Sequence, residues 1–286
     1  MRFISAAAGL ICTLLLPLAA MAECTQPRLR LAVIPKKSMQ VTMREYRPLL
    51  NLLSDELKMP VDMVAVSSYE SVIDAIVSGG VDIAWLGPAS YIQAYLREPG
   101  IEPFASLTLS EGHFTPAGHH YRALLMVRRD GASDLDELRG ASVALSDPAS
   151  TSGSLVPKTE FSAQTNLPLE RFFSAVSYSG SHDNSLDALL EGRVDAAFVA
   201  SVRADAYLSD GRMERDTLRL LWQSAPIYYD PYVFSARICP QLKERVRQVM
   251  LSHPQSLADF LNMQHASGVA PVGHAEYLPL LKLINK

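Results

Sequence analysis

The chain has 286 residues, of which 48% are hydrophobic and 20% are charged, with a formal net charge of −4 at pH 7. This length exceeds one small domain and suits two lobes. The mildly acidic balance argues against a nucleic-acid partner, so an anion site in this chain would have to act through local groups and not through bulk positive charge.

The first 22 residues have the pattern of a secretory signal peptide. Arg2 supplies a positive n-region, residues 10–18 are largely apolar, and Ala20-Met21-Ala22 has the small-x-small pattern of a cleavage site. The apolar stretch is too short to span a bilayer comfortably, although a retained membrane anchor is the alternative. Glu23 in front of Cys24 argues against a lipoprotein. We therefore expect cleavage before Glu23 and a soluble periplasmic protein.

Two cysteines, Cys24 and Cys239, remain after that cleavage. Two thiols in an exported protein suggest one disulfide bond. We expect this bond to join the start of the first predicted strand, just after Cys24, to the later segment around Cys239 that returns to the first of the two lobes.

The first part of the mature chain alternates strands with helices. A strand at 29–34 precedes a helix whose apolar residues fall on one face. A second strand follows near 61–66, then a helix from Tyr69 and a strand that ends at Trp85. This alternation predicts a mostly parallel sheet covered on both faces. In such sheets ligands gather at the carboxyl ends of strands, beside helix N-termini.

Two stretches of the chain repeat each other at a constant offset. Residues 73–85 (IDAIVSGGVDIAW) match residues 186–198 (LDALLEGRVDAAF), with Asp, Ala, Gly, Val, Asp and Ala in register. The same offset carries residues 31–35 onto 144–148, each a predicted strand that ends in proline. Both copies predict a helix, a glycine stop and a short strand, which indicates two similar α/β lobes.

A run of hydroxyl side chains follows the first strand of the second copy. Residues 147–154 (DPASTSGS) place Ser150, Thr151 and Ser152 where a strand should lead into a helix. The first turn of a helix leaves backbone N–H groups without partners, and the helix dipole favours negative charge there. The hydroxyls add donors and Gly153 lets the backbone come close, so the run suits a tetrahedral oxyanion. An ordinary Ser/Thr helix cap is the alternative.

Two segments are predicted to cross between the lobes. Residues 121–128 have the pattern of a strand that enters the second lobe, and residues 226–238 (containing YYDPY) have the pattern of the return. Residues 241–284 are helical in pattern and should pack on the first lobe. A hinge between paired lobes makes a cleft. The predicted boundaries are a signal peptide at 1–22, lobe 1 at 23–120, lobe 2 at 121–226, and the return crossing with the rest of lobe 1 at 227–286.

Four pieces of the chain together resemble the PhnD-like periplasmic binding proteins for phosphonate, phosphite and phosphate that serve ABC importers. They are residues 81–88 (VDIAWLGP), residues 147–157 (DPASTSGSLVP), residues 179–182 (SGSH) and the Asp230-Pro231 step. The resemblance covers nearly the whole mature chain. It implies a two-lobed α/β fold of the type II periplasmic binding proteins, each lobe a mostly parallel sheet flanked by helices. It also implies one ligand between closing lobes and delivery to a membrane permease.

The resemblance also implies a set of ligand-binding residues. They are an oxyanion loop at Ser150, Thr151 and Ser152, cleft tyrosines at Tyr69 and Tyr121, a histidine at His182 and an aspartate at Asp230. Binders of aminoalkylphosphonates in this family carry an acid after the Val-Asp strand of the second lobe, where it pairs with the ligand ammonium. Residues 199–202 (VASV) contain no acid. We therefore expect phosphate, phosphite or a short alkylphosphonate, bound by a monomer without a cofactor or a catalytic residue.

Other interpretations of single residues remain open at this point. His182 could simply cap its helix, Tyr69 and Tyr121 could be core aromatics, and Asp230 before a proline could be a turn residue. The repeated Asp82 and Asp195 are expected to be structural. They are set within strands, away from the strand ends.

Three alternative functions also follow from the residue types. Ser152, His182 and Asp230 could supply a hydrolase triad, but no serine lies in the Gly-x-Ser-x-Gly pattern of a nucleophile elbow. His113, His119 and His120 are close in sequence, but no cysteine or clear carboxylate set completes a metal site. The same fold could report its ligand state to a membrane sensor kinase instead of a permease, and the sequence does not separate these two partners.

Overall fold

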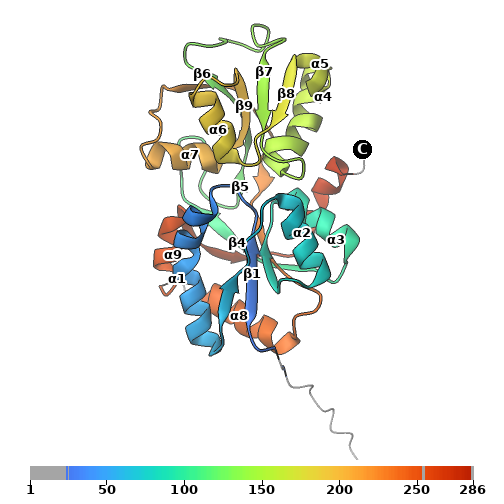
Figure 1. Cartoon of the computed structure of the whole chain (residues 1–286), viewed down its shortest axis with the longest axis vertical. Helices are drawn as coiled ribbons and strands as arrows, with labels where there is room; N and C mark the ends of the chain where they lie inside the picture. The colour runs from blue at the N-terminus through green and yellow to red at the C-terminus, as the bar shows by residue number, and fades with distance from the viewer. Residues whose placement is uncertain (1–23, 25, 253–254, 285–286) are drawn as a thin grey trace, which may run out of the picture.

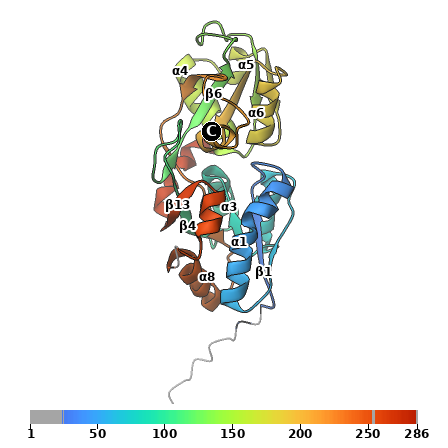
Figure 2. The ribbon, with the colours of Figure 1, turned by 90° about the vertical axis from the view of Figure 1, so that its left-hand side faces the viewer.

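The computed structural model describes residue 24 and residues 26–252 and 255–284, which form two lobes stacked along the long axis of the molecule (Figure 1). The view turned by 90° shows the same division (Figure 2). The predicted signal peptide at 1–22 lies outside the described residues. Over the part of the chain that the structure describes, none of the helices is long and apolar enough to cross a membrane.

The first lobe is built on a six-stranded sheet in the order β13-β4-β12-β3-β1-β2. Its strands are β1 (Leu29–Val33), β2 (Val61–Met63), β3 (Ile83–Trp85), β4 (Glu102–Leu109), β12 (Pro231–Phe234) and β13 (Ala266–Pro271). β2 and β3 run parallel to β1, whereas β12 is antiparallel to both β3 and β4, and β13 is antiparallel to β4. The strands before the crossing therefore share one direction, and the two that follow the return run the other way.

Helices cover both faces of this sheet. They are α1 (Met39–Leu57), α2 (Tyr69–Ser78), α3 (Pro88–Arg97), α8 (Pro240–Ser252) and α9 (Ala258–Met263), with short 3-10 helices η3 (His274–Glu276) and η4 (Leu278–Leu283). Leu31 of β1 packs in the core with α1, α8 and α9, while its neighbour Ala32 packs in the core with α2 and α3. Successive strand side chains point to opposite faces, so the sheet is buried on both sides as the sequence predicted.

The prediction of a helical tail is wrong for one segment. Residues 266–271 form β13 at the edge of the sheet, where they pair with β4. The segment ASGVAP is short and rich in small residues, so it carries no clear periodicity. Its strand conformation comes from pairing with β4, a contact between distant parts of the chain.

The second lobe is built on a five-stranded sheet in the order β10-β6-β9-β7-β8. Its strands are β6 (Ala123–Arg128), β7 (Ser142–Leu145), β8 (Ala175–Tyr178), β9 (Ala196–Ala200) and β10 (Leu218–Gln223). Its helical segments are η1 (Thr151–Leu155) and η2 (Pro157–Phe161), both π-helical, then α4 (Ser162–Thr165), α5 (Leu169–Phe172), α6 (His182–Leu190) and α7 (Ser201–Ser209). β7 is parallel to β8 and β9, and β6 is antiparallel to β9 and β10.

The sequence repeat corresponds to one structural unit in each lobe. α2 is followed by Gly79 and β3, and α6 is followed by Gly192 and β9. Both glycines have a left-handed backbone, with φ of 73° and 72°, which favours glycine at these helix ends. Asp82 accepts the Arg30 backbone N–H at 2.7 Å, and Asp195 accepts the Ser142 backbone N–H at 2.8 Å. Each carboxylate therefore joins the starts of two neighbouring strands, which is a structural role as expected. The expected position within a strand is wrong, because Asp82 directly precedes β3 and Asp195 directly precedes β9.

A two-stranded ribbon connects the lobes where the crossings were predicted. β5 (His120–Tyr121) pairs antiparallel with β11 (Ile227–Tyr228). His119 stacks on Tyr228 with ring centroids 5.9 Å apart, and His120 contacts the same ring edge-on at 5.1 Å. Among the described residues, no group of three or more His, Cys, Asp or Glu side chains is arranged to hold a metal ion.

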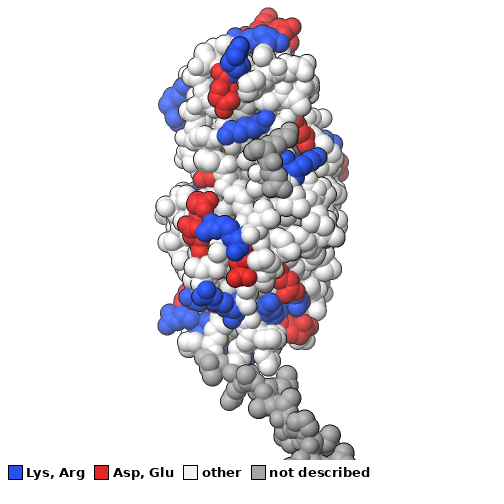
Figure 3. All heavy atoms as spheres, turned by 90° about the vertical axis from the view of Figure 1, so that its right-hand side faces the viewer, with Lys and Arg blue, Asp and Glu red and all other residues white. Residues whose placement is uncertain are grey.

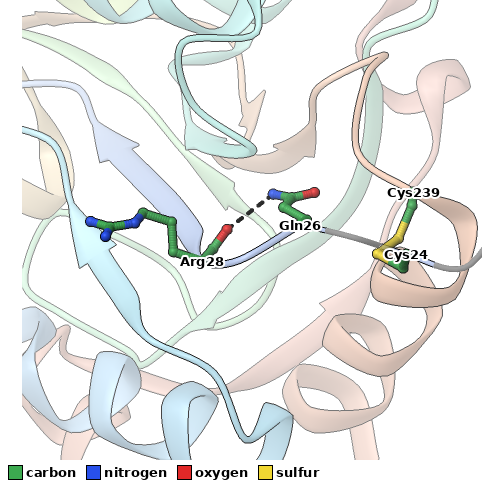
Figure 4. The surroundings of a disulfide bond; sticks show 4 residues. All are labelled: Cys24, Gln26, Arg28 and Cys239. Carbon is green, nitrogen blue, oxygen red and sulfur yellow. Dashed lines mark hydrogen bonds between the residues drawn. A yellow bond between two sulfur atoms is a disulfide. The ribbon is translucent and has the colours of Figure 1, made fainter.

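The structure bonds Cys24 to Cys239, which precedes α8 (Figure 4). Their Cα atoms are 6.0 Å apart and their sequence separation is 215. The bond thus fastens the segment before β1 to the chain that returns from the second lobe. Beside it, Gln26 Nε2 donates to the Arg28 carbonyl at 3.2 Å.

Candidate functional site

A small buried cavity lies where the two lobes meet. Its lining brings together all seven residues that the resemblance selected, together with four others: Ile34, Lys36, Tyr69, Gly87, Tyr121, Ser150, Thr151, Ser152, His182, Ala200 and Asp230. The cavity volume is about 10 Å³, which is about what a single water molecule needs. The lobes are therefore closed around a very compact, polar site.

The hydroxyl loop follows β7 and presents its side chains at the start of a helix. Ser150 caps η1 by accepting the Gly153 N–H at 3.1 Å, and Thr151 Oγ1 accepts the Ala89 N–H of the first lobe at 2.9 Å. Accepting a hydrogen bond does not use the hydroxyl proton, so each of these side chains can still donate. A Cβ at Gly153 would clash with Oγ of Ser146 and lie 2.9 Å from Cε1 of His182, so glycine lets the loop pack closely against both side chains.

His182 is the first residue of α6, and its ring lies in the interior of the second lobe. Nδ1 accepts the Ala200 backbone N–H at 3.2 Å and lies 2.8 Å from Ser146 Oγ. Burial, helped by the charges of Lys36 and Arg203, lowers the pKa of His182 well below its usual value, so the ring is neutral. Its proton is then on Nε2, 3.4 Å from Ser150 Oγ and facing the cavity.

This arrangement does not assemble a hydrolase relay. In a Ser-His-Asp triad the carboxylate accepts the Nδ1 proton of the histidine. Here Nδ1 of His182 is an acceptor already occupied by Ala200, and the Asp230 carboxylate is paired with Lys36. The three residue types lie at one cavity without the connections that the reaction needs.

The two tyrosines are fully buried and keep their protons. Tyr69 is the first residue of α2, and its hydroxyl makes no hydrogen bond within the described residues. Tyr121 ends β5, in the ribbon between the lobes. Burial and then the charge of Asp230 raise the pKa of both phenols well above the usual value. Both hydroxyls are therefore neutral donors toward the cavity.

Asp230 forms a buried ion pair with Lys36, a residue that the sequence analysis missed. Lys36 Nζ contacts Asp230 Oδ2, while Oδ1 makes no hydrogen bond within the described residues. Burial raises the pKa of Asp230 and lowers the pKa of Lys36, and each charge opposes that effect on its partner. Lys36 is the third residue after the end of β1, at the carboxyl end where ligands gather in parallel sheets. That position was the available signal.

Hydrogen bonds from the first lobe fix the backbone beside this carboxylate. Trp85 Nε1 donates to the Asp230 carbonyl at 3.2 Å, and Ser106 Oγ donates to the same oxygen at 3.1 Å. With its backbone held, the unpaired Oδ1 is an acceptor at a fixed position in a site otherwise rich in donors.

The charge at this site comes from buried groups. The face of the molecule in Figure 3 carries Lys and Arg interspersed with Asp and Glu, without a broad field of one sign. Inside the cavity, hydroxyls, phenols and one imidazole N–H surround a lysine and an aspartate. This set can hold an ion with several acceptor oxygens and one acidic proton.

The family model described as "ABC transporter, phosphonate, periplasmic substrate-binding protein" matches residues 31–277. The chain belongs to this family. Among curated relatives, the phosphate-import protein PhnD of Mycolicibacterium smegmatis is 24% identical over 280 residues, 91% of this chain and 86% of the relative. The phosphonates-binding periplasmic protein of Escherichia coli is 26% identical over 246 residues, 84% of this chain and 70% of the relative.

Solved structures share the fold of this periplasmic substrate-binding family. A binding protein component of an ABC phosphonate transporter from Pseudomonas aeruginosa aligns with a TM-score of 0.80 at 23% identity, covering 91% of this chain and 86% of its own. PhnD1 of Prochlorococcus marinus, in complex with methylphosphonate, aligns with a TM-score of 0.77 at 19% identity, covering 90% and 97%. The predicted family and the predicted two-lobed α/β fold are both confirmed.

Proposed function

We propose that this protein captures a small tetrahedral phosphorus oxyanion, namely phosphate, phosphite or a short alkylphosphonate, and delivers it to an ABC permease. One observation carries the choice of ligand. The hydroxyl loop at 150–152, both tyrosines and Nε2 of His182 direct donors at one cavity, which also holds the unpaired carboxylate oxygen of Asp230.

In this proposal the donors and the acceptor have different tasks. The hydroxyls of Ser150, Thr151 and Ser152, with Tyr69, Tyr121 and His182, donate to the oxyanion oxygens. Asp230 Oδ1 accepts the acidic proton that phosphate, phosphite and alkylphosphonate monoanions carry. Hydrogen bonds to a charged group contribute about 1.5–3 kcal/mol each, so several of them hold an ion without a large basic surface.

The site favours a ligand without an ammonium group. Residues 199–202 contain no acid, and the Asp230 carboxylate already has Lys36 as its cation. The lining of the small cavity holds no acidic side chain besides Asp230, so an ammonium in that cavity would lose its hydration and gain no new carboxylate partner. We therefore expect 2-aminoethylphosphonate to bind no more tightly than methylphosphonate.

Isothermal titration calorimetry on the purified, refolded protein tests the proposal. The ligands are phosphate, phosphite, methylphosphonate, 2-aminoethylphosphonate and sulfate, with refolding used to remove any ion carried through purification. We expect saturable binding of at least one of the first three. Absence of binding by all three would contradict the proposed ligand class.

The same proposal covers how the protein is exported and assembled. We expect cleavage before Glu23 and a soluble periplasmic monomer, with lobe 1 at 23–120 completed by the return crossing and tail at 227–286, and lobe 2 at 121–226. We expect no nucleic-acid partner and no cofactor. The protein binds its ligand without transforming it. Amino-terminal sequencing of the exported protein tests the cleavage site, and an intact Met1 in the membrane fraction would overturn it.

A further inference from the structure

A second and larger cavity lies beside the oxyanion cavity. Its volume is about 300 Å³, and both lobes line it, with Trp85 and Tyr229 from the first lobe and Arg203 from the second. Its lining combines aromatic, aliphatic and charged side chains. Among the described residues, Lys36 is the one residue that lines both cavities.

The side chain of Lys36 stands between the two spaces. Its Nζ contacts Asp230 of the small cavity, and the same atom is 4.0 Å from the ring centroid of Trp85 and 4.9 Å from that of Tyr229. Both rings line the large cavity and Asp230 lines the small one. The ammonium is thus held from both sides, by a carboxylate and by two aromatic faces.

The backbone of Lys36 is also fixed when the lobes are closed. Its N–H donates to the Ile34 carbonyl at 2.9 Å, and its carbonyl accepts the Asp183 N–H of the second lobe at 3.3 Å. Lys36 is 5% exposed as a whole residue, and its Nζ is held between the Asp230 carboxylate and the rings of Trp85 and Tyr229. Lys36 is therefore a fixed part of the wall and not a mobile surface lysine.

We propose that Lys36 is a specificity-determining residue, whose side chain separates the two cavities and so limits the length of the substituent that an oxyanion ligand can carry on phosphorus. This inference rests on the proposed function and names the feature that restricts its substrate class. A longer substituent on phosphorus would have to leave the small cavity through the position of the Lys36 side chain. Without that side chain it would enter the larger cavity beside Trp85 and Tyr229.

The test must separate the size of Lys36 from its charge. Replacing Lys36 alone leaves Asp230 buried without its cation, which is strongly destabilising in proteins. The informative pair is therefore Lys36→Ala/Asp230→Asn against Lys36→Met/Asp230→Asn. Both variants lack the buried charges, and they differ only in the bulk at position 36. Circular dichroism and thermal unfolding establish that each variant is folded.

Calorimetry with methyl-, ethyl- and propylphosphonate gives the readout. The wild-type protein and the Met variant should bind more weakly as the chain lengthens. The Ala variant should bind more tightly, by about fourfold for each methylene that enters the large cavity. From methyl- to propylphosphonate, the affinity of the Ala variant relative to the Met variant should thus rise by roughly tenfold or more.

The outcomes separate this inference from the proposed function. Equal chain-length profiles in the two double variants would overturn the separating role of Lys36, as would a wild-type protein that binds propylphosphonate as tightly as methylphosphonate. Failure of the wild-type protein to bind any phosphorus oxyanion would overturn the proposed function instead. Lys37→Met/Glu45→Gln is the matched control, because Lys37 lines only the large cavity and pairs with Glu45, and this double variant should keep the wild-type profile.

Discussion

The backbone N–H of Ala200 donates to Nδ1 of His182 at 3.2 Å, and this contact determines which ring nitrogen carries the proton. A backbone amide can only donate, so Nδ1 must be without a proton. Ser146 then donates its hydroxyl to the same nitrogen. The last residue of β9 therefore makes Nε2 the donor that the histidine presents to the cavity.

This geometry predicts different results for two substitutions of His182. His182→Ala removes the donor and should weaken methylphosphonate binding at least tenfold, since a hydrogen bond to a charged group contributes about 1.5–3 kcal/mol. His182→Gln can place an amide N–H near the position of Nε2 and should lose clearly less. Calorimetry on both variants measures the difference. Equal losses would show that the ring acts through packing and not as a donor.

The neutral state of His182 also predicts how stability depends on pH. The pKa of His182 is lowered well below 6.5 by burial, whereas the unfolded chain takes up the proton near 6.5. As the pH falls below about 6.5, the unfolded state binds more protons than the folded state, so this residue makes the protein less stable in acid. Between pH 8 and pH 5, the melting temperature of the wild-type protein should fall further than that of His182→Gln. Parallel curves for the two proteins would contradict the shift.

The Thr151 hydroxyl both accepts a hydrogen bond within the protein and keeps a proton to donate. Its Oγ1 accepts the Ala89 N–H at 2.9 Å, which leaves the hydroxyl proton for the oxyanion. Thr151→Ala should weaken methylphosphonate binding by about tenfold or more. Thr151→Ser keeps the hydroxyl and serves as the matched control, with a smaller loss. Calorimetry that finds Ala and Ser equivalent would contradict this role.

Local patterns account for the prediction of the hydroxyl loop, whereas Tyr69, Tyr121, His182 and Asp230 were selected by the resemblance to the family. Ser150 and His182 lie at helix starts, and a helix start is encoded by a few consecutive residues such as a serine cap. The position of Lys36 after β1 was a local signal, but its pairing with Asp230 could not be found in this way, because Asp230 comes from the return crossing, far away in the chain. The edge strand β13 was missed for the same reason, since its conformation depends on pairing with β4.

The Cys24–Cys239 bond should contribute substantially to stability. It closes a loop with a sequence separation of 215, and the chain-entropy model gives about 5 kcal/mol as an upper guide for such a loop. Reduction, or the double replacement Cys24→Ser/Cys239→Ser, should lower the melting temperature by roughly 5–15 °C. Differential scanning calorimetry measures this. A melting temperature unchanged by reduction, with two free thiols found by mass spectrometry in the untreated protein, would refute the bond.

Discrimination against sulfate follows from the unpaired oxygen of Asp230. Phosphate, phosphite and methylphosphonate monoanions each carry a proton that can lie between the ligand and Asp230 Oδ1, whereas sulfate carries none near neutral pH. Sulfate would therefore leave two acceptors facing each other in a closed cavity. We expect the wild-type protein to bind phosphate or methylphosphonate and to reject sulfate when both are measured by calorimetry at the same pH and ionic strength.

Replacing Asp230 tests the cause of that discrimination. Asp230→Asn offers an amide N–H where the carboxylate could only accept. The affinity for sulfate should therefore rise by about tenfold or more relative to the affinity for phosphate. The same change also frees the ammonium of Lys36, which would attract either anion. Lys36→Met/Asp230→Asn removes that cation and isolates the amide. The measured quantity is the ratio of the affinities for sulfate and phosphate. If this ratio stays above the wild-type value in the double variant, the acceptor at Oδ1 is the discriminating group, because the bulk at position 36 is kept and no free cation remains.

A return to the wild-type ratio in the double variant would instead assign the gain to Lys36. An unchanged ratio in both variants would show that Asp230 does not face the bound ion.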